Sequence, residues 1–281
     1  MGTRYRAAGA PRGPLPAWLR HPDLVLAGFV LLLVLAWAVA PSLVTGQDPA
    51  QGVPADRLQG PSAAHVFGTD HLGRDLFARV VHGARLTLQA TVLAVLIGLV
   101  AGTLVGLVAG FLRGMVDDVL MRVVDVLLSI PSLLLSMALI TALGFGTVQV
   151  AVAVGIGTVA NFARVMRSEV LKVSASPYVE AARAGGVRTT GVLFRHVLPN
   201  AAGPVLALSA LEFGVAVLSV SALSFLGFGS PPPAPEWGAL VSGGRDYLAT
   251  AWWLTTLPGL VVVAVVLSTH RIARALERGT A

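Results

Sequence analysis

The chain has 281 residues, of which 55% are hydrophobic and 12% are charged, and its formal net charge is +6. Soluble proteins typically carry about 25% charged residues, so this composition excludes an ordinary soluble domain and favours an integral membrane protein. The basic residues are spread thinly between apolar runs, which argues against a nucleic-acid-binding surface.

Two residue counts exclude further classes of site. The chain has no cysteine, which rules out disulfides, thiolate metal sites and cysteine catalysis. Its single lysine, Lys172, follows Glu-Val-Leu, whereas the phosphate loop of an ATPase places its lysine directly after a glycine. Any work driven by ATP therefore requires a partner. His65, His71 and His82 have spacings that do not place them on one helix face, and no Ser/His/Asp arrangement is evident, so we expect no cofactor, no metal and no catalytic residue in this chain.

Six apolar runs are long enough as helices to cross a hydrocarbon core, which needs about 20 residues. They lie near Leu24–Leu43, Leu86–Leu112, Val119–Leu143, Val148–Val165, Pro199–Phe228 and Trp252–Ala273. The first resembles a signal peptide, because Ala38-Val39-Ala40 is a small-x-small cleavage site. Pro41 would follow that cut and the run is unusually long, so we expect an uncleaved first helix. The sequence thus predicts an all-α membrane protein with six transmembrane helices.

The distribution of basic residues predicts the orientation. With the N-terminus inside, fifteen of the 20 Lys and Arg residues fall on the inner side and five on the outer side. Because basic loops stay in the cytoplasm, we expect both termini to be cytoplasmic. The expected parts are a cytoplasmic tail (1–22), a first transmembrane helix (23–45), an outer loop (46–84), a five-helix core (85–275) with a cytoplasmic loop at 166–199, and a second cytoplasmic tail (276–281).

Four glycines recur at intervals of four in the second apolar run. They are Gly98, Gly102, Gly106 and Gly110. Residues four apart share one face of a helix, so these glycines form a smooth groove that suits close approach of another helix. Direct lining of a translocation pathway is the alternative.

Two carboxylates lie inside apolar runs, where charged residues are costly and often functional. Asp125, near the start of the third run, either lines a pathway or joins Arg122 and Asp118 in an interfacial network at i,i+3 and i,i+4 spacings. Glu212 lies deep in the fifth run, where insertion of a carboxylate costs about 3 kcal/mol. It either lines a pathway or makes a buried structural hydrogen bond.

A polar segment, SPYVEAARAGGVRTTGVLFRHVLPN (residues 176–200), interrupts the apolar runs. Ser176 and Pro177 favour the start of a helix, with the serine as its N-cap. Gly185 and Gly186 favour its end. A second short helical piece follows and closes at a proline. We therefore expect a helix–turn–helix elbow on the cytoplasmic side, with small residues that let a partner protein approach closely.

This segment resembles the EAA motif of permease subunits of ABC importers, written E-A-A-x3-G-x9-I-x-L-P. The matching residues are Glu180, Ala181, Ala182, Gly186, Leu198 and Pro199, and His196 stands in the place of the isoleucine. Tyr178, Arg183 and Gly185 complete the expected coupling loop. The ending Phe-Arg-His-Val-Leu-Pro-Asn is similar to the dipeptide/oligopeptide branch of that family.

A second stretch, GTDHLGRDLFARVVHGARLTL, resembles the outer-loop signature GTDxxGRDxxSRxxxGxRxSL of the same branch. The matching site residues are Gly68, Thr69, Asp70, Gly73, Arg74, Asp75 and Arg85, and Arg79, Gly83 and Leu88 also agree. Ala78 and Thr87 stand where the signature has serines. VDVLLSIPSLLL and ALSFLGFGSPPPAPEWG are similar to family members as well, so the resemblance spans roughly residues 20–275.

The resemblance implies the MetI-like fold of type I ABC importers and a place in the bacterial inner membrane, as the C-type permease of a pair. The partners that it implies are a second homologous permease, one or two cytoplasmic ATPase subunits that bind ATP and magnesium, a periplasmic or lipid-anchored substrate-binding protein, membrane lipid and a peptide substrate. The coupling loop would dock into a groove on the ATPase, so this chain would be a transport subunit and not an enzyme.

Two alternatives remain open. A permease of the same fold could carry a nickel chelate, haem or an antimicrobial peptide, because the motifs discriminate poorly between cargoes. A proton-coupled secondary transporter would use Glu212 and Asp125, but it would have no purpose for the elbow. A membrane enzyme is disfavoured because the sequence has no convergent catalytic set.

Overall fold

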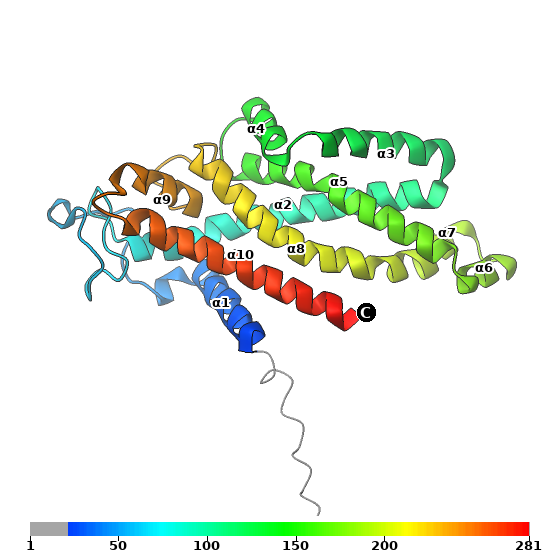
Figure 1. The fold of residues 1–281 in the computed structure, drawn as a ribbon, viewed down its shortest axis with the longest axis horizontal. Helices are drawn as coiled ribbons and strands as arrows, with labels where there is room; N and C mark the ends of the chain where they lie inside the picture. The colour runs from blue at the N-terminus through cyan, green and yellow to red at the C-terminus, as the bar shows by residue number, and fades with distance from the viewer. Residues whose placement is uncertain (1–21, 281) are drawn as a thin grey trace, which may run out of the picture.

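The computed structural model describes residues 22–280, with side chains to residue 275, and its regular structure in this range is helical (Figure 1). The helices are α1 (Pro22–Val39), α2 (Leu76–Leu112), α3 (Gly114–Ser129), α4 (Ser132–Leu143), α5 (Thr147–Ser174), α6 (Pro177–Ala184), α7 (Thr189–Gly191), the π-helical η4 (Val192–Val197), α8 (Leu198–Phe225), α9 (Trp237–Gly244) and α10 (Trp253–Thr280), with 3-10 turns η2 (Pro41–Leu43), η3 (Pro54–Asp56) and η5 (Arg245–Tyr247). The expected tail at 1–22 lies outside the described residues except for Pro22.

Five helical segments are long and apolar enough to cross a membrane: α1, α2, α5, the run Thr189–Phe225 and α10. The third expected span is not one straight helix, because α3 and α4 meet at an angle of 96°. Pro131 offers no amide hydrogen and disfavours helical geometry in the preceding residue. Ile130 is accordingly extended, with φ −94° and ψ 128°. Val119–Leu143 therefore forms either a broken span or a re-entrant loop.

Two boundaries also differ from those expected. The loop predicted to reach residue 84 ends at Asp75, whose Oδ1 accepts a hydrogen bond from the backbone N–H of Ala78 at 2.7 Å and caps α2. An N-cap of this kind satisfies an amide that the helix start leaves unpaired. At the other end of the chain, α10 continues through residues 276–280, which were expected to form a tail.

Four long helices, α2, α5, α8 and α10, run side by side along the molecule (Figure 1). The closest pair is α2 and α5, which meet at Gly98, Gly102, Gly106 and Gly110, a row that we call the glycine ridge. A β-carbon added at Gly102 would lie 2.5 Å from the carbonyl oxygen of Val159, and one at Gly110 would lie 2.9 Å from that of Arg167. Only glycine allows two helix backbones to come this close.

One end of the molecule, which we call the loop end, gathers residues 40–75, α9 and the start of α10, whereas α6 lies at the opposite, elbow end (Figure 1). Two buried tryptophans hold the loop end together. The indole N–H of Trp237 donates to the carbonyl of Val80 at 2.9 Å, and that of Trp253 donates to the carbonyl of Thr69 at 3.3 Å. Buried indoles normally need such a partner.

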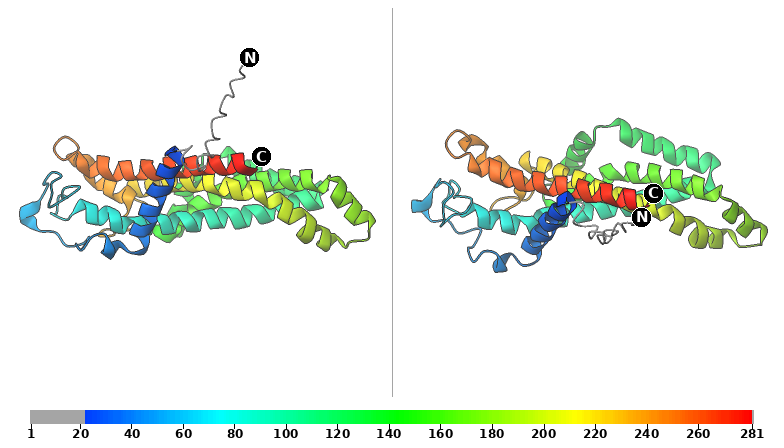
Figure 2. Two further views of the ribbon diagram at one scale, coloured as in Figure 1. Left: turned by 90° about the horizontal axis from the view of Figure 1, so that it is seen from below. Right: turned by 60° about the horizontal axis from the view of Figure 1, so that its bottom comes forward.

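Helix α1 crosses the others obliquely and contacts α10 and α2 (Figure 2). Most of its apolar surface is exposed in the single chain, including Leu26, Phe29 and Leu32. An ion pair between Asp23 and Arg271 joins its first turn to α10. A helix with this much apolar surface uncovered suits a lipid or protein environment rather than water.

Candidate functional site

The elbow helix α6 presents most of the expected coupling residues on its surface. Val179 is completely buried and belongs to the same hydrophobic cluster as Val192 and Val197, which anchors the helix to η4. On the uncovered side, the exposed coupling residues are Tyr178, Glu180, Ala181, Arg183, Gly185, Gly186 and Pro199, while Ala182, His196 and Leu198 are half-buried. The result is a mostly small-residue surface with one acidic and one basic side chain, fixed from beneath by a single apolar anchor.

The end of α6 is a Schellman turn, which fixes the direction of the chain beyond it. The N–H of Gly186 donates to the carbonyl of Arg183 at 3.0 Å, and the N–H of Val187 donates to that of Ala182 at 3.1 Å. Gly186 has φ +79°, a conformation that only glycine adopts without strain. The start of α6 differs from expectation, because the hydroxyl of Ser176 donates to the carbonyl of Val173 and does not cap the helix.

The expected second short helix of the elbow is continuous with α8. The connection is the π-helical turn η4, in which the N–H of Leu198 reaches back five residues to the carbonyl of Leu193. Pro199 has no N–H to offer the ordinary i−4 bond. One residue later, the side-chain amide of Asn200 donates to the carbonyl of His196 at 2.7 Å. The Leu-Pro-Asn sequence therefore creates a local change of helical pitch where the elbow joins the span.

Glu212, one of the two pathway candidates, is buried within the single chain at 7% exposure. It lies on α8 and faces α5, where the side-chain amide of Asn161 donates to its Oε1 at 2.9 Å. Its Oε2 is buried without a hydrogen-bond partner among the described residues. Burial of a carboxylate with only one of its two oxygens hydrogen-bonded is costly.

The other pathway candidate, Asp125, is exposed and pairs with Arg164 of α5 at 2.8 Å. The pairs expected within the third run, from Asp118 to Arg122 and from Arg122 to Asp125, are not among the ion pairs of the described residues. Instead, the ion pairs cross between helices: Arg167 binds Asp117 through Nε and an Nη at 2.5 and 2.6 Å. Two arginines three residues apart on α5 thus hold α3 against the bundle.

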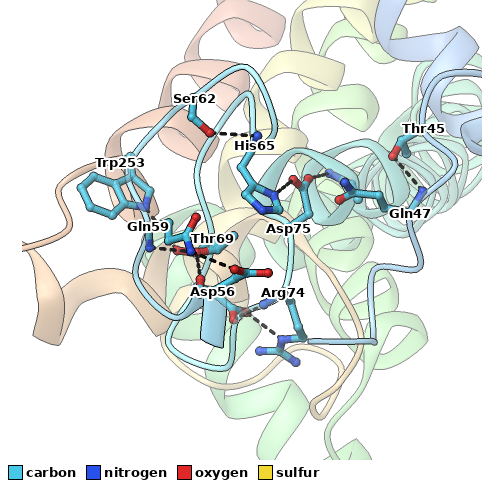
Figure 3. Close-up of polar contacts among 12 residues, drawn as sticks. Thr45, Gln47, Asp56, Gln59, Ser62, His65, Thr69, Arg74, Asp75 and Trp253 are labelled. Carbon is cyan, nitrogen blue, oxygen red and sulfur yellow. Dashed lines mark hydrogen bonds and ion pairs between the residues drawn. The ribbon is translucent and has the colours of Figure 1, made fainter. Parts of the chain in front are cut away.

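The loop-end signature is brought together mainly around Asp70 and around Asp75, which lies beside His65 (Figure 3). Oδ2 of Asp70 accepts from Nε of Arg74 at 2.7 Å, while its Oδ1 accepts from the backbone N–H groups of Leu72 and Arg74 at 2.8 and 3.0 Å. Asp75 caps α2 with one oxygen and lies 2.9 Å from Nδ1 of His65 with the other. The two carboxylates therefore order the loop.

Glycine is required at two positions of this loop. Gly68 and Gly73 have φ values of +77° and +76°. A β-carbon at Gly73 would also collide with the carbonyl oxygen of Val53. Arg85 lies apart from the rest of the signature, exposed on α2, where it lines a largely apolar groove with Leu35 and Phe213.

Several residues that make these contacts were not predicted from the sequence. Asn161 gave no signal because an isolated amide in an apolar run has many interpretations. Arg164 and Arg167 could have been found, since their spacing places them on one face of a helix opposite the acidic residues of α3. Arg79 matched the signature but was given no role, although it is nearly buried and lines a cavity at the loop end.

Comparisons with known proteins agree on one family. The model of the binding-protein-dependent transport system inner membrane component matches residues 102–281. The dipeptide transport system permease protein DppC of Alkalihalophilus pseudofirmus is 38% identical over 254 residues, which cover 90% of this chain and 82% of that protein. The glutathione transport system permease protein GsiD of Pectobacterium atrosepticum is 36% identical and covers 92% of this chain and 87% of its own.

Solved structures support the same fold. An inward-facing structure of the MetNI methionine ABC transporter matches with a TM-score of 0.58 and 21% identity. The match covers 70% of this chain and 96% of the chain in that structure.

Proposed function

This chain belongs to the family of binding-protein-dependent transport system inner membrane components, and from this premise we propose that it forms half of the translocation pathway of an ATP-driven importer of small peptides. It is a multi-pass protein of the inner membrane. The pathway is completed by a second, homologous permease. ATP hydrolysis takes place on separate ATPase subunits, for which the elbow is the docking surface.

The observation that carries this proposal is the surface of α6. Glu180 and Arg183 are exposed on it among small residues, whereas Val179 anchors it from beneath. Small residues admit a close protein neighbour, and charged residues at the rim select its orientation. The proposed orientation places α6 and both termini in the cytoplasm, in agreement with the bias of basic residues, and the loop end outside, where a substrate-binding protein delivers the cargo.

The cargo is proposed as dipeptides or other short peptides. The relatives named above carry dipeptide and glutathione transport in their names, and glutathione is itself a tripeptide. Mass spectrometry of the ligand that co-purifies with the associated binding protein tests this assignment. A nickel chelate or haem in that ligand fraction would replace the cargo and leave the permease role intact.

The coupling role is tested by substitutions on α6. Glu180→Lys and Gly186→Val should leave membrane insertion intact and abolish ATP-driven peptide uptake by proteoliposomes that contain the full complex. Gly203→Val is the matched control, because Gly203 lies on α8 outside the coupling loop and a β-carbon there meets no atom within 4 Å. Unchanged uptake in the Glu180 and Gly186 variants would refute the elbow as the coupling element.

Co-purification separates this proposal from a proton-coupled transporter. The tagged chain should retain ATPase subunits through detergent extraction, and Glu180→Lys should release them. Uptake that follows a proton gradient in the absence of any ATPase would favour the secondary transporter instead.

A further inference from the structure

A small cavity at the loop end carries an unmatched positive charge. It has a volume of about 210 Å³. It is lined by residues 70–79 of the outer-loop signature, by residues 230–234, by α9 and by the first turn of α10. Its charged lining consists of Asp70, Arg74 and Arg79. One carboxylate faces two guanidinium groups, so the cavity has an excess of one positive charge.

Arg79 is the unmatched group. It is 5% exposed, and its Nη1 donates to the carbonyl of Pro49 at 3.0 Å. Its Nε has no hydrogen-bond partner among the described residues. The nearest carboxylate oxygen, Oδ2 of Asp70, lies 3.8 Å from that Nε and already accepts from Arg74. A buried guanidinium without a hydrogen-bonded carboxylate would be stabilised by an anionic ligand.

The size and walls of the cavity restrict that ligand. Pockets for small-molecule ligands usually exceed about 300 Å³, so this one suits a single side chain better than a whole peptide. Apart from the charged residues its walls are mainly apolar, including Leu72, Pro232 and Ala234. An aliphatic arm that ends in a carboxylate, as in glutamate, matches both features.

The cavity does not continue toward the membrane-spanning bundle. Leu76, Leu240 and Leu254 line it and are almost completely buried, so they close it with packed core. A cargo molecule that entered would have no onward route. The occupant therefore comes from outside and remains attached to a larger molecule.

We propose that this cavity is a socket for an acidic side chain of the substrate-binding protein, with Arg79 as its carboxylate-binding residue. The inference rests on the proposed function, which places a binding protein at this end. It gives a role to the GTDxxGRD signature: Asp70 hydrogen-bonds Arg74 and lies 3.8 Å from Arg79, so Arg79 has no hydrogen-bonded carboxylate of its own and can pair with one from the binding protein.

Docking of the binding protein to the complete transporter in lipid nanodiscs tests the socket. Arg79→Gln should weaken the affinity of the peptide-free binding protein about ten-fold, because loss of one buried, charge-assisted pair typically has at least that effect. Arg79→Lys should recover part of the affinity. Arg57→Gln removes the same charge from an exposed position of the same loop and should change the affinity less than about two-fold. The unfolding temperature of each complex is measured to exclude a folding defect.

Neutralising the carboxylates of the binding protein with a carbodiimide and glycine ethyl ester supplies the complementary arm. It should weaken docking to the wild-type complex strongly and docking to Arg79→Gln much less. Unchanged affinity of a stable Arg79→Gln complex would overturn the socket. An effect confined to binding protein loaded with its co-purifying peptide would assign the carboxylate to the cargo, and would overturn it as well.

Failure of the socket proposal can be distinguished from failure of the proposed function. If the wild-type complex neither binds the binding protein nor hydrolyses ATP faster in its presence, the importer role itself fails. If Glu180→Lys abolishes stimulated ATP hydrolysis while docking persists, the importer role stands and only the Arg79 variants decide the socket.

Discussion

The side-chain amide of Asn161 on α5 donates a hydrogen bond to Oε1 of Glu212 on α8 at 2.9 Å, and the second oxygen of that carboxyl group has no partner among the described residues. Both residues lie within segments apolar enough to span a membrane. The pair therefore links two helices through one polar contact and leaves one acceptor open.

Substitutions of Glu212 distinguish an effect on assembly of the complex from an effect on transport. Glu212→Gln keeps a side chain that can still accept from Asn161, so it should assemble normally. Glu212→Ala leaves Asn161 unpaired and should cost about 1–3 kcal/mol of stability if the role is structural only. We expect Glu212→Ala to lower peptide uptake without lowering recovery of the intact complex. Normal uptake together with lost assembly would reduce Glu212 to a structural hydrogen bond.

Much of this architecture could be predicted from the sequence, since an apolar run of sufficient length has few choices in a bilayer other than a helix. The bounds of the helix in the EAA-like segment could also be predicted, because Pro177 at its start and the Gly-Gly pair at its end act through local backbone geometry, although Ser176 does not cap it. The break at Pro131 also has a local cause, but the apolar residues on both sides of it made the sequence resemble one continuous span.

Contacts between distant helices could not be predicted in the same way. The pairing of Asp117 with Arg167 depends on how α3 folds back on α5, which no local pattern specifies. Within α3, Asp118, Arg122 and Asp125 have spacings that suit intrahelical pairs worth only about 0.2–0.5 kcal/mol each. A bidentate pair with a partly buried carboxylate is stronger, so the tertiary arrangement decides the partner.

The Asp117–Arg167 pair should contribute measurably to stability. Asp117→Asn is expected to destabilise the solubilised protein by about 1–2 kcal/mol, because it leaves Arg167 without its bidentate partner. Asp118→Asn is the matched control, since Asp118 is its exposed neighbour. Exchange of the two charges by Asp117→Arg with Arg167→Asp should restore part of the loss. Equal unfolding temperatures for the Asp117 and Asp118 variants would show that the pair contributes nothing.

A third prediction concerns the glycine ridge. At Gly102 a new methyl group would lie 2.5 Å from the carbonyl oxygen of Val159, and a backbone atom can yield only if the helix moves. Gly102→Ala should therefore destabilise the protein by about 1–3 kcal/mol. Gly203→Ala, on α8, meets no atom within 4 Å and should be neutral or slightly stabilising. Thermal unfolding in detergent compares the two, and similar curves would contradict the role of the ridge in packing.

Glu236 at the start of α9 gives a prediction on pH. Burial raises the pKa of its carboxyl group to about 7, whereas an unfolded glutamate has a pKa of about 4.3. The folded state thus retains a proton that the unfolded state releases between these values, so this group lowers stability as pH rises from about 4.3 to 7. Glu236→Gln should match the wild type at pH 4.5 and exceed it at pH 8, by at most about 4 kcal/mol.

Unfolding temperatures across this pH range provide the measurement for Glu236. The exposed carboxylate of Asp246, which lies just beyond α9, serves as the comparison. Asp246→Asn should show no gain that grows with pH. A constant difference between Glu236→Gln and the wild type at all pH values would mean that the buried carboxyl group does not titrate in this range.

Because the backbones of α2 and α5 are in contact along the glycine ridge, we expect the two helices to move as one rigid body. Helix α2 has 37 residues and is therefore about 55 Å long. Its first turn holds Arg79 at the loop end, while α5 leads directly into α6 at the other. A displacement of the elbow would then tilt both helices and move the part of α2 that lies at the loop end. Under the proposed coupling role, tilting of these two packed helices would carry motion from the elbow to the loop end without a chain of side-chain rearrangements.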